Sequence, residues 1–276
     1  MRFSSSSRFS VCWVRPVTHL LMVSMMLMVS GCGSRDSNNK GPMSDSPYKQ
    51  IKRSGPRQAA FRMRSQNYMK QIGIAMHTFH EFYGQLPIGE SDRANYPIEY
   101  RDGKPLLSWR VYLLPFLEQE QLYDQFKLNE PWDSPHNIKL LDQMPDQYKS
   151  LDYQGLGNKT VVFGLSGPGG IFEPAAPGDP GEAHPTVRFR DITDGTSQVV
   201  LVVMAHPGKA IPWTQPGDFI FNPENPREGL ASANGEFLSL FGDGSAWHIG
   251  KQVSPETLLK LFQYRDGAPI DSNELQ

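Results

Sequence analysis

The chain has 276 residues, of which 38% are apolar and 20% charged, a balance typical of globular proteins and unlike that of disordered or collagen-like chains. Its 25 glycines and 23 prolines interrupt the chain too often for an all-helical bundle. The formal net charge of −2, without a long basic run, argues against a nucleic-acid partner, which requires clustered phosphate contacts.

The N-terminus is typical of a secretory signal. Residues 1–31 carry arginines and no acidic residue, and an apolar run extends from Val17 to Val29. A transmembrane helix needs about 20 apolar residues, and this run is shorter. The sequence Val29-Ser30-Gly31-Cys32 resembles the bacterial lipobox, in which cleavage makes the cysteine the first residue and its sulfur is diacylated. We therefore expect a lipoprotein signal peptide over 1–31 and a palmitate-type anchor at Cys32.

The anchor has consequences for location and stability. Two acyl chains bury enough methylene groups, at about 0.8 kcal/mol each, for stable membrane attachment. By resemblance to lipoprotein sorting rules, Gly33 after the cysteine favours the outer membrane over the inner membrane. The only other cysteine, Cys12, lies in the removed segment, so the processed chain has no intrachain disulfide.

The segment after the anchor is polar and rich in turn-forming residues. Residues 32–58 contain almost nothing apolar to bury, which predicts a flexible tether with a root-mean-square reach of roughly 30 Å. We expect residues 59–276 to form a single domain.

Helices are predicted mainly in the first half of this domain. Over Ala59–Tyr83 apolar residues recur at the three- and four-residue spacing of a helix face, and Gly84 and Pro87 end the pattern. Shorter helices are predicted over Pro115–Phe126, from Ser134-Pro135 to Gln143, and from Ser254-Pro255 to Gln263.

The second half is richer in β-type patterns. Strands are predicted at Thr160–Leu165, Thr186–Ile192, Gln198–Met204, Phe237–Phe241 and Ser245–Ile249. The pairs Asp194-Gly195 and Asp243-Gly244 lie between consecutive strands and favour tight hairpin turns. Helices followed by strands indicate an α+β fold.

Several sequence blocks resemble one known family. The segment Asn67 to His77 is similar to the pattern Asn-Leu-Lys-Gln-Ile-Gly-Leu-Ala-Leu-His of domain-of-unknown-function family 1559 of planctomycetes. The resemblance continues in Leu107-Ser108-Trp109-Arg110, Leu114–Gln119, Pro131–Asn137, Asp191–Ser197, Pro212-Trp213-Thr214 and Phe241–Ser245. It covers nearly the whole processed chain.

This resemblance implies a pilin-like fold with a long N-terminal helix packed on an antiparallel sheet. It implies no catalytic residues, because the activity of the family is unknown. The chain departs from the family pattern in three places: it has a lipobox in place of a pilin-type cleavage signal, Ala233 in place of a histidine, and no cysteine near Lys149-Ser150.

Two groups of polar residues are candidates for metal sites. His77 and His80 lie three residues apart on the predicted long helix and are weak candidates for metal ligands, but their spacing supplies no third ligand. Packing and hydrogen bonding to a neighbouring strand is the simpler role for both histidines. Asp191 and Asp194 could share a cation, although turn capping is expected for them.

Four tryptophans are candidates for ligand contact: Trp109, Trp132, Trp213 and Trp247. Exposed together on one face, they could stack on sugar rings or anchor a partner. The alternative is that they fill the core, with their indole nitrogens bonded to loop carbonyls.

The sequence favours a non-enzymatic, lipid-anchored extracytoplasmic envelope protein that serves as an interaction or structural module without a cofactor. Expected partners are the membrane, through the lipid, and envelope proteins or further copies of the chain. The alternative is an extracytoplasmic glycan- or solute-binding protein that uses the tryptophans and the loop Gly167–Pro185. A third hypothesis is a metal-dependent hydrolase built on His77 and His80.

Overall fold

The structure is a computed structural model that describes residues 48–52, 54–89, 91, 93, 95–173, 186–230, 235–270 and 274. The predicted signal peptide, Cys32, most of the predicted tether, part of the loop Gly167–Pro185 and Ala233 lie outside the described residues. The chain divides into two units, Met1–Pro42 and Met43–Gln276, and the description below concerns the second.

The longest element is helix α1, Gly55–Tyr83, which confirms the predicted N-terminal helix. Pro56 stands in its first turn, where a missing N–H costs nothing. The helix ends at Gly84, whose φ of 75° is left-handed and whose N–H donates to the carbonyl of His80. Immediately before it, β1 (Lys49–Gln50) pairs antiparallel with β4 (Tyr153–Gln154), so the last residues of the predicted tether belong to the fold.

The central sheet has five strands in the order β11-β10-β7-β6-β9. All neighbours pair antiparallel except β6 and β9, which are parallel. The bounds are β6 Val162–Ser166, β7 Val200–Met204, β9 Phe219–Ile220, β10 Phe237–Phe241 and β11 Ala246–Ile249.

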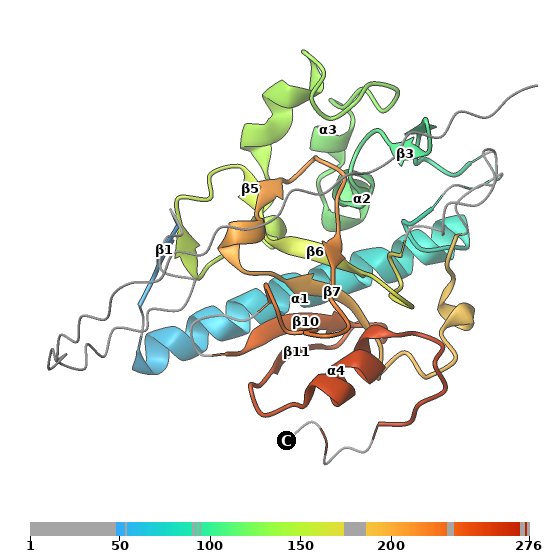
Figure 1. The fold of residues 1–276 in the computed structure, drawn as a ribbon. Coiled ribbons are helices and arrows are strands. Elements are labelled where there is room, and N and C mark those ends of the chain that lie inside the picture. Colours follow the sequence, from blue (N-terminus) through green and yellow to red (C-terminus); the bar gives the residue numbers. More distant parts are fainter. Residues whose placement is uncertain are drawn as a thin grey trace, which may run out of the picture. The chain divides into compact units, whose positions relative to one another are not determined.

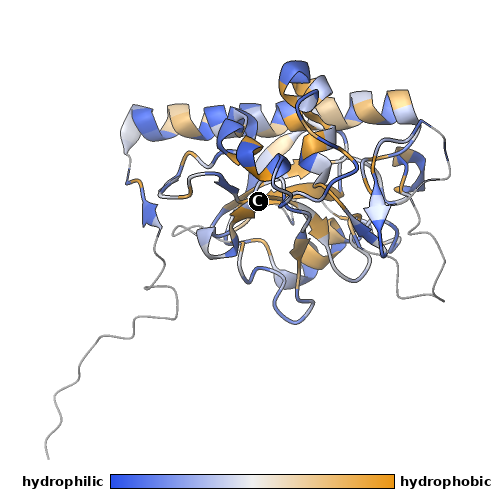
Figure 2. Ribbon diagram, turned by 90° about the horizontal axis from the view of Figure 1, so that it is seen from above, coloured by the Kyte–Doolittle hydropathy of each residue, from blue (hydrophilic) through white to orange (hydrophobic). Residues whose placement is uncertain are grey.

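Helices cover both faces of this sheet. Helix α1 contacts β10 and β11, and α4 (Pro255–Phe262) contacts β7 (Figure 1). Residues of β10 alternate between the two sides: Leu238 and Leu240 join the cluster around α1, whereas Phe237 and Phe241 join the cluster around α4. The sheet strands are therefore hydrophobic, whereas hydrophobic and hydrophilic residues alternate along α1 (Figure 2).

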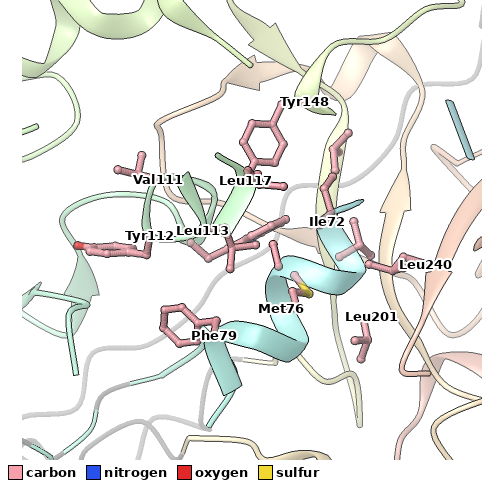
Figure 3. Close-up of a cluster of buried hydrophobic side chains, with 14 of the residues drawn as sticks. Ile72, Met76, Phe79, Val111, Tyr112, Leu113, Leu117, Tyr148, Leu201 and Leu240 are labelled. Carbon is pink, nitrogen blue, oxygen red and sulfur yellow. The ribbon is translucent and has the colours of Figure 1, made fainter. Parts of the chain in front are cut away.

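Short helices complete the larger core on the α1 side. They are α2 (Trp109–Tyr112), α3 (Glu120–Tyr123) and the 3₁₀ helices η1 (Leu114–Leu117), η2 (Asn137–Gln143) and η3 (Asp146–Tyr148). Figure 3 shows side chains of α1 packed among residues of these helices and of the sheet: Ile72, Met76, Phe79, Leu113, Leu117, Leu201 and Leu240.

Among the described residues, two strand pairs besides β1–β4 and the 3₁₀ turns η4 and η5 also lie outside the sheet. The hairpin of β2 (Tyr100–Arg101) and β3 (Lys104–Pro105) turns at Asp102 and Gly103, both with positive φ. The other elements are β5 (Lys159–Thr160) paired with β8 (Ile211–Pro212), η4 (Phe189–Asp191) and η5 (Pro207–Lys209).

The α+β fold class is confirmed, and several local predictions need correction. The predicted helix Pro115–Phe126 is divided into η1 and α3, because Glu118 adopts a left-handed φ of 60° between them. The helix predicted from Ser134 to Gln143 is the shorter 3₁₀ helix η2, which begins at Asn137 with His136 and not Ser134 in the N-cap position, although Ser134 Oγ accepts the Asn137 N–H. The C-terminal helix and its Ser254 cap are confirmed.

The predicted strand Thr186–Ile192 is wrong, and so is the hairpin expected at Asp194-Gly195. The Asp191 carboxylate accepts the Arg188 N–H and closes the turn η4, and the Phe189 ring stacks on His77 of α1. This segment therefore packs against the helix and does not pair with β7. The hairpin at Asp243-Gly244 is confirmed and joins β10 to β11.

None of the helices in the described part of the chain is long and apolar enough to span a bilayer.

Candidate functional site

His77 and His80 contact protein groups in the structure. His77 Nε2 lies 2.9 Å from the Gly242 carbonyl oxygen, and its ring stacks on Phe189 at 4.1 Å between centroids. His80 Nε2 accepts the Phe189 N–H at 3.4 Å, and burial, followed by the neighbouring His77, lowers the pKa of His80. Both rings fix the η4 segment and the β10–β11 turn to α1, as their packing role predicts.

Of the two candidate aspartates, Asp191 caps its own turn as expected, whereas Asp194 binds a distant segment. Asp191 caps η4, and the Asp194 carboxylate accepts the N–H groups of Asp266 and Gly267, which ties down the C-terminal segment. Across the described ranges, no three His, Cys, Asp or Glu side chains lie close enough together to hold a metal ion.

The four candidate tryptophans do not share one face. Trp213 is fully buried, and its Nε1 donates to the Leu141 carbonyl at 2.9 Å, so the core interpretation holds for this residue. Trp109 is buried as well, but its Nε1 donates to a carboxylate, that of Asp218. Trp247 is 60% exposed on β11, at the sheet edge opposite β9. The expectation that the tryptophans fill the core is therefore wrong for Trp247. Trp132 is partly buried.

Two of these tryptophans, Trp109 and Trp132, line a groove of about 660 Å³. Its walls come from the chain after α1, the β2–β3 hairpin, the start of α2, the end of β6, Phe172-Glu173 and the segment from Gln215 to Ile220. A predominantly apolar cleft of this size with a few polar groups is the usual form of a small-ligand site. We therefore take this groove as the candidate functional site.

The polar centre of the groove is Asp218. Its Oδ1 accepts hydrogen bonds from Trp109 Nε1 at 2.9 Å and from the Gly164 N–H at 3.1 Å. Desolvation raises the pKa of this carboxyl, and the positive charge of nearby Arg110 opposes the rise. The carboxyl group is thus held in a fixed orientation by two donors from distant parts of the chain.

Arg110 interacts electrostatically with this carboxyl group, does not line the groove and has no exposed surface. Its guanidinium donates to the Val162 carbonyl at 2.7 Å, to Ser108 Oγ at 2.6 Å and to the Gly217 carbonyl at 3.3 Å. Burial lowers the pKa of Arg110 to about 10, a shift that Asp218 opposes, so the group is cationic at neutral pH. The positive charge compensates the carboxylate without occupying the groove.

Some polar atoms of the groove lack partners among the described residues. The second carboxylate oxygen of Asp218 and Nε1 of Trp132 make no hydrogen bond within the described part of the chain, although both residues line the groove. Ile220, on the edge strand β9, is 73% exposed beside them. The groove therefore offers an open acceptor and an open donor beside apolar side chains, and its lining also includes the charged residues Arg101, Asp102, Lys104 and Glu173.

The sequence predicted Trp109 and Trp132 as candidates for ligand contact but did not indicate Asp218. A single aspartate in Pro216-Gly217-Asp218 resembles any turn residue, and its partner Trp109 is 109 positions away. Its one sequence signal is its position shortly after the Pro212-Trp213-Thr214 block.

A second, more polar cavity of about 530 Å³ lies near the start of α1. Its lining includes His248 and the Arg62–Glu236 ion pair, whose N–O distance is 2.6 Å. His248 Nε2 is buried without a hydrogen-bond partner, and burial lowers the pKa of His248 to about 4. These groups contain no arrangement that points to one ligand class.

Comparisons with known proteins identify the family of the chain but no individual relative. No curated protein and no solved structure matches the chain. Residues 54–228 match the family SBP_bac_10, whose description is "Protein of unknown function (DUF1559)". That region extends from the start of α1 through the groove, and includes the motif residues His77, Arg110 and Trp213 described above. The match covers more than half of the chain, and the protein therefore belongs to this DUF1559 family.

Proposed function

We propose that the protein is a lipid-anchored extracytoplasmic envelope protein that acts by binding and not by catalysis. The lipobox at Cys32 and the polar segment after it support attachment to a membrane surface. The observation that carries the binding role is the groove lined by Trp109 and Trp132, with its open acceptor and donor. Its proposed partners are envelope proteins or further copies of the chain.

Acylation at Cys32 is the first test of this proposal. Cells that express the full chain are labelled with palmitate, and the protein is followed in membrane and soluble fractions. We expect label in the wild type, loss of label and of membrane partition in Cys32→Ala, and no change in the control Cys12→Ala, because Cys12 lies within the predicted signal. Unchanged membrane partition of Cys32→Ala would contradict the anchor.

The membrane that holds the anchor is the second part of the proposal. Because Gly33 follows the cysteine, the protein is expected in the outer membrane. Density separation of the two membranes tests this, and Gly33→Asp should move the protein to the inner-membrane fraction. An inner-membrane location of the wild type would contradict the sorting argument.

A more specific function, glycan or solute binding, is favoured by the same groove. Aromatic side chains at a concave surface provide the apolar platform on which rings stack. Quenching or enhancement of tryptophan fluorescence by added envelope polysaccharides would detect such binding. No comparable observation favours a metal-dependent hydrolase, because His77 and His80 are engaged by Gly242 and Phe189.

A further inference from the structure

We infer that the groove binds a neutral sugar ring, with the carboxylate of Asp218 and the indole nitrogen of Trp132 as its two hydrogen-bonding anchors. This inference rests on the proposed binding function and names the chemical class of the ligand. Three features of the groove support the inference of a sugar ligand: its open polar atoms, its compensated charge and its apolar walls.

The open polar atoms match the groups that a sugar offers. Asp218 uses one carboxylate oxygen for Trp109 Nε1 and the Gly164 N–H, and its other oxygen has no partner in the described part of the chain. Trp132 Nε1 is likewise without a hydrogen-bond partner there. A sugar hydroxyl is both donor and acceptor, so neighbouring hydroxyls of one ring can satisfy a carboxylate oxygen and an indole N–H.

The balance of charge around the groove favours a neutral ligand. Arg110 is completely buried, interacts electrostatically with Asp218 and is held by Val162, Ser108 and Gly217. Its positive charge offsets the carboxylate. The other charged residues of the lining are two basic ones, Arg101 and Lys104, and two acidic ones, Asp102 and Glu173, so the groove has no net counter-charge to offset the desolvation of an ionic ligand. A neutral hydroxylated ring gains charge-assisted hydrogen bonds to the carboxylate without that cost.

The walls provide surfaces for the apolar faces of a ring. Trp132 is partly buried, Phe172 packs on Trp109 at 5.6 Å between centroids, and Ile220 is 73% exposed at the rim. The C–H faces of a pyranose pack on such surfaces while its hydroxyls stay at the edges. The volume of about 660 Å³ lies within the range of about 300–1,000 Å³ that small-ligand sites occupy.

The test is a titration of the full-length acylated protein in a detergent without a sugar headgroup. The probes are neutral oligosaccharides (cellopentaose, maltopentaose and penta-N-acetylchitopentaose) and two charged ones, oligogalacturonate and chitosan pentamer. Calorimetry and tryptophan fluorescence measure binding. We expect at least one neutral probe to bind, and the charged probes to bind at least tenfold more weakly.

Two variants in the groove and one control variant outside it test whether the sugar binds in the groove. Trp132→Phe keeps an aromatic ring and removes the indole N–H, and Asp218→Asn keeps an acceptor for Trp109 and Gly164 but loses the second acceptor. Each should weaken binding at least tenfold, whereas Trp247→Phe, at the opposite sheet edge, should bind as the wild type does. Thermal unfolding verifies that each variant is folded, and Trp132→Phe leaves the Arg110–Asp218 pair intact if Asp218→Asn is unstable.

The outcomes separate this inference from the proposed function. Absence of binding to every neutral probe, preferential binding of a charged probe, or wild-type affinity in Trp132→Phe would each overturn the sugar assignment. None of these results affects palmitate labelling at Cys32, which tests the anchor alone. Conversely, an unlabelled protein that still binds a neutral sugar through Trp132 would overturn the anchor and keep the sugar site.

Discussion

Arg110 shows how one side chain connects the family pattern to the fold. It lies in the block Leu107-Ser108-Trp109-Arg110, has no exposed surface, and its guanidinium lies near the rings of Trp109 and Phe163 at 4.8 and 5.2 Å. An uncompensated charge in such a place is very unfavourable, but three acceptors and the Asp218 charge offset the cost. Arg110 thereby joins α2, β6 and the groove floor.

We predict that Arg110→Met lowers the free energy of unfolding by about 3–5 kcal/mol. The substitution leaves the Asp218 carboxylate without its counter-charge and removes the donors for Val162 and Ser108. Urea denaturation measures the loss. The double variant Arg110→Met with Asp218→Asn should be destabilised by less than the sum of the two single changes, and strict additivity would contradict the charge coupling.

His248 makes stability depend on pH. Burial and the Arg62 charge hold its pKa near 4 in the folded protein, although Glu236 opposes the shift, and the ordinary value is 6.5. The folded protein thus binds fewer protons than the unfolded chain between about pH 6.5 and pH 4. Stability from this residue is complete above pH 6.5 and is lost as the pH falls toward 4.

We therefore predict that His248→Gln flattens the pH dependence of unfolding. Between pH 7 and pH 5 the wild type should lose about 1–2 kcal/mol through this histidine, and the variant should lack that component. Urea unfolding midpoints of both proteins at the two pH values give the comparison. Equal losses in the wild type and the variant would show that another group is responsible.

At the scale of elements, the packing of α1 on the sheet depends on a glycine. A Cβ at Gly73 would lie 2.9 Å from Leu240 Cδ1 and 3.1 Å from the Gly244 Cα, both closer than ordinary contact. Gly73 is also the glycine of the family pattern in α1. The close approach lets His77, one turn further along, reach the Gly242 carbonyl.

We predict that Gly73→Ala destabilises the protein by about 1–2 kcal/mol, since the overpacking cost of about 1–3 kcal/mol exceeds the gain in helix propensity of about 1 kcal/mol. The matched control is Ile74→Ala, because Ile74 is 64% exposed on the same helix and should change stability by less than about 0.5 kcal/mol. Urea denaturation distinguishes the two. A Gly73→Ala protein as stable as the wild type would contradict the close packing.

At the scale of the whole molecule, anchoring and folding are expected to be separable. Contacts divide the chain between Pro42 and Met43, and the described residues after that point form two hydrophobic clusters. We predict that a chain of residues 43–276 keeps the cooperative thermal transition of the acylated protein but does not partition into membranes. Differential scanning calorimetry and vesicle flotation measure the two properties, and loss of the transition would contradict this division.

The candidate site was only partly predictable from the sequence. Trp109 and Trp132 stand out because large aromatic residues are rare in turn-rich segments, and the structure places both in the groove. Asp218 does not stand out, and Arg110 stands out only as part of a family block, because the role of each depends on a contact with a residue far away in the chain. The same residue type is fully buried at Trp213 and largely exposed at Trp247.

The sequence by itself determined the features that depend on neighbours along the chain: the periodicity of α1, its end at Gly84, the Asp243-Gly244 turn and the cap at Ser254. The tertiary structure decided the features that depend on distant partners. Phe189 stacks on His77 and so its segment is a turn and not a strand, β9 pairs parallel to β6, and Asp218 meets Trp109. The physical reason is that local backbone preferences are properties of short segments, whereas burial, strand pairing and charge compensation arise only when separated segments pack together.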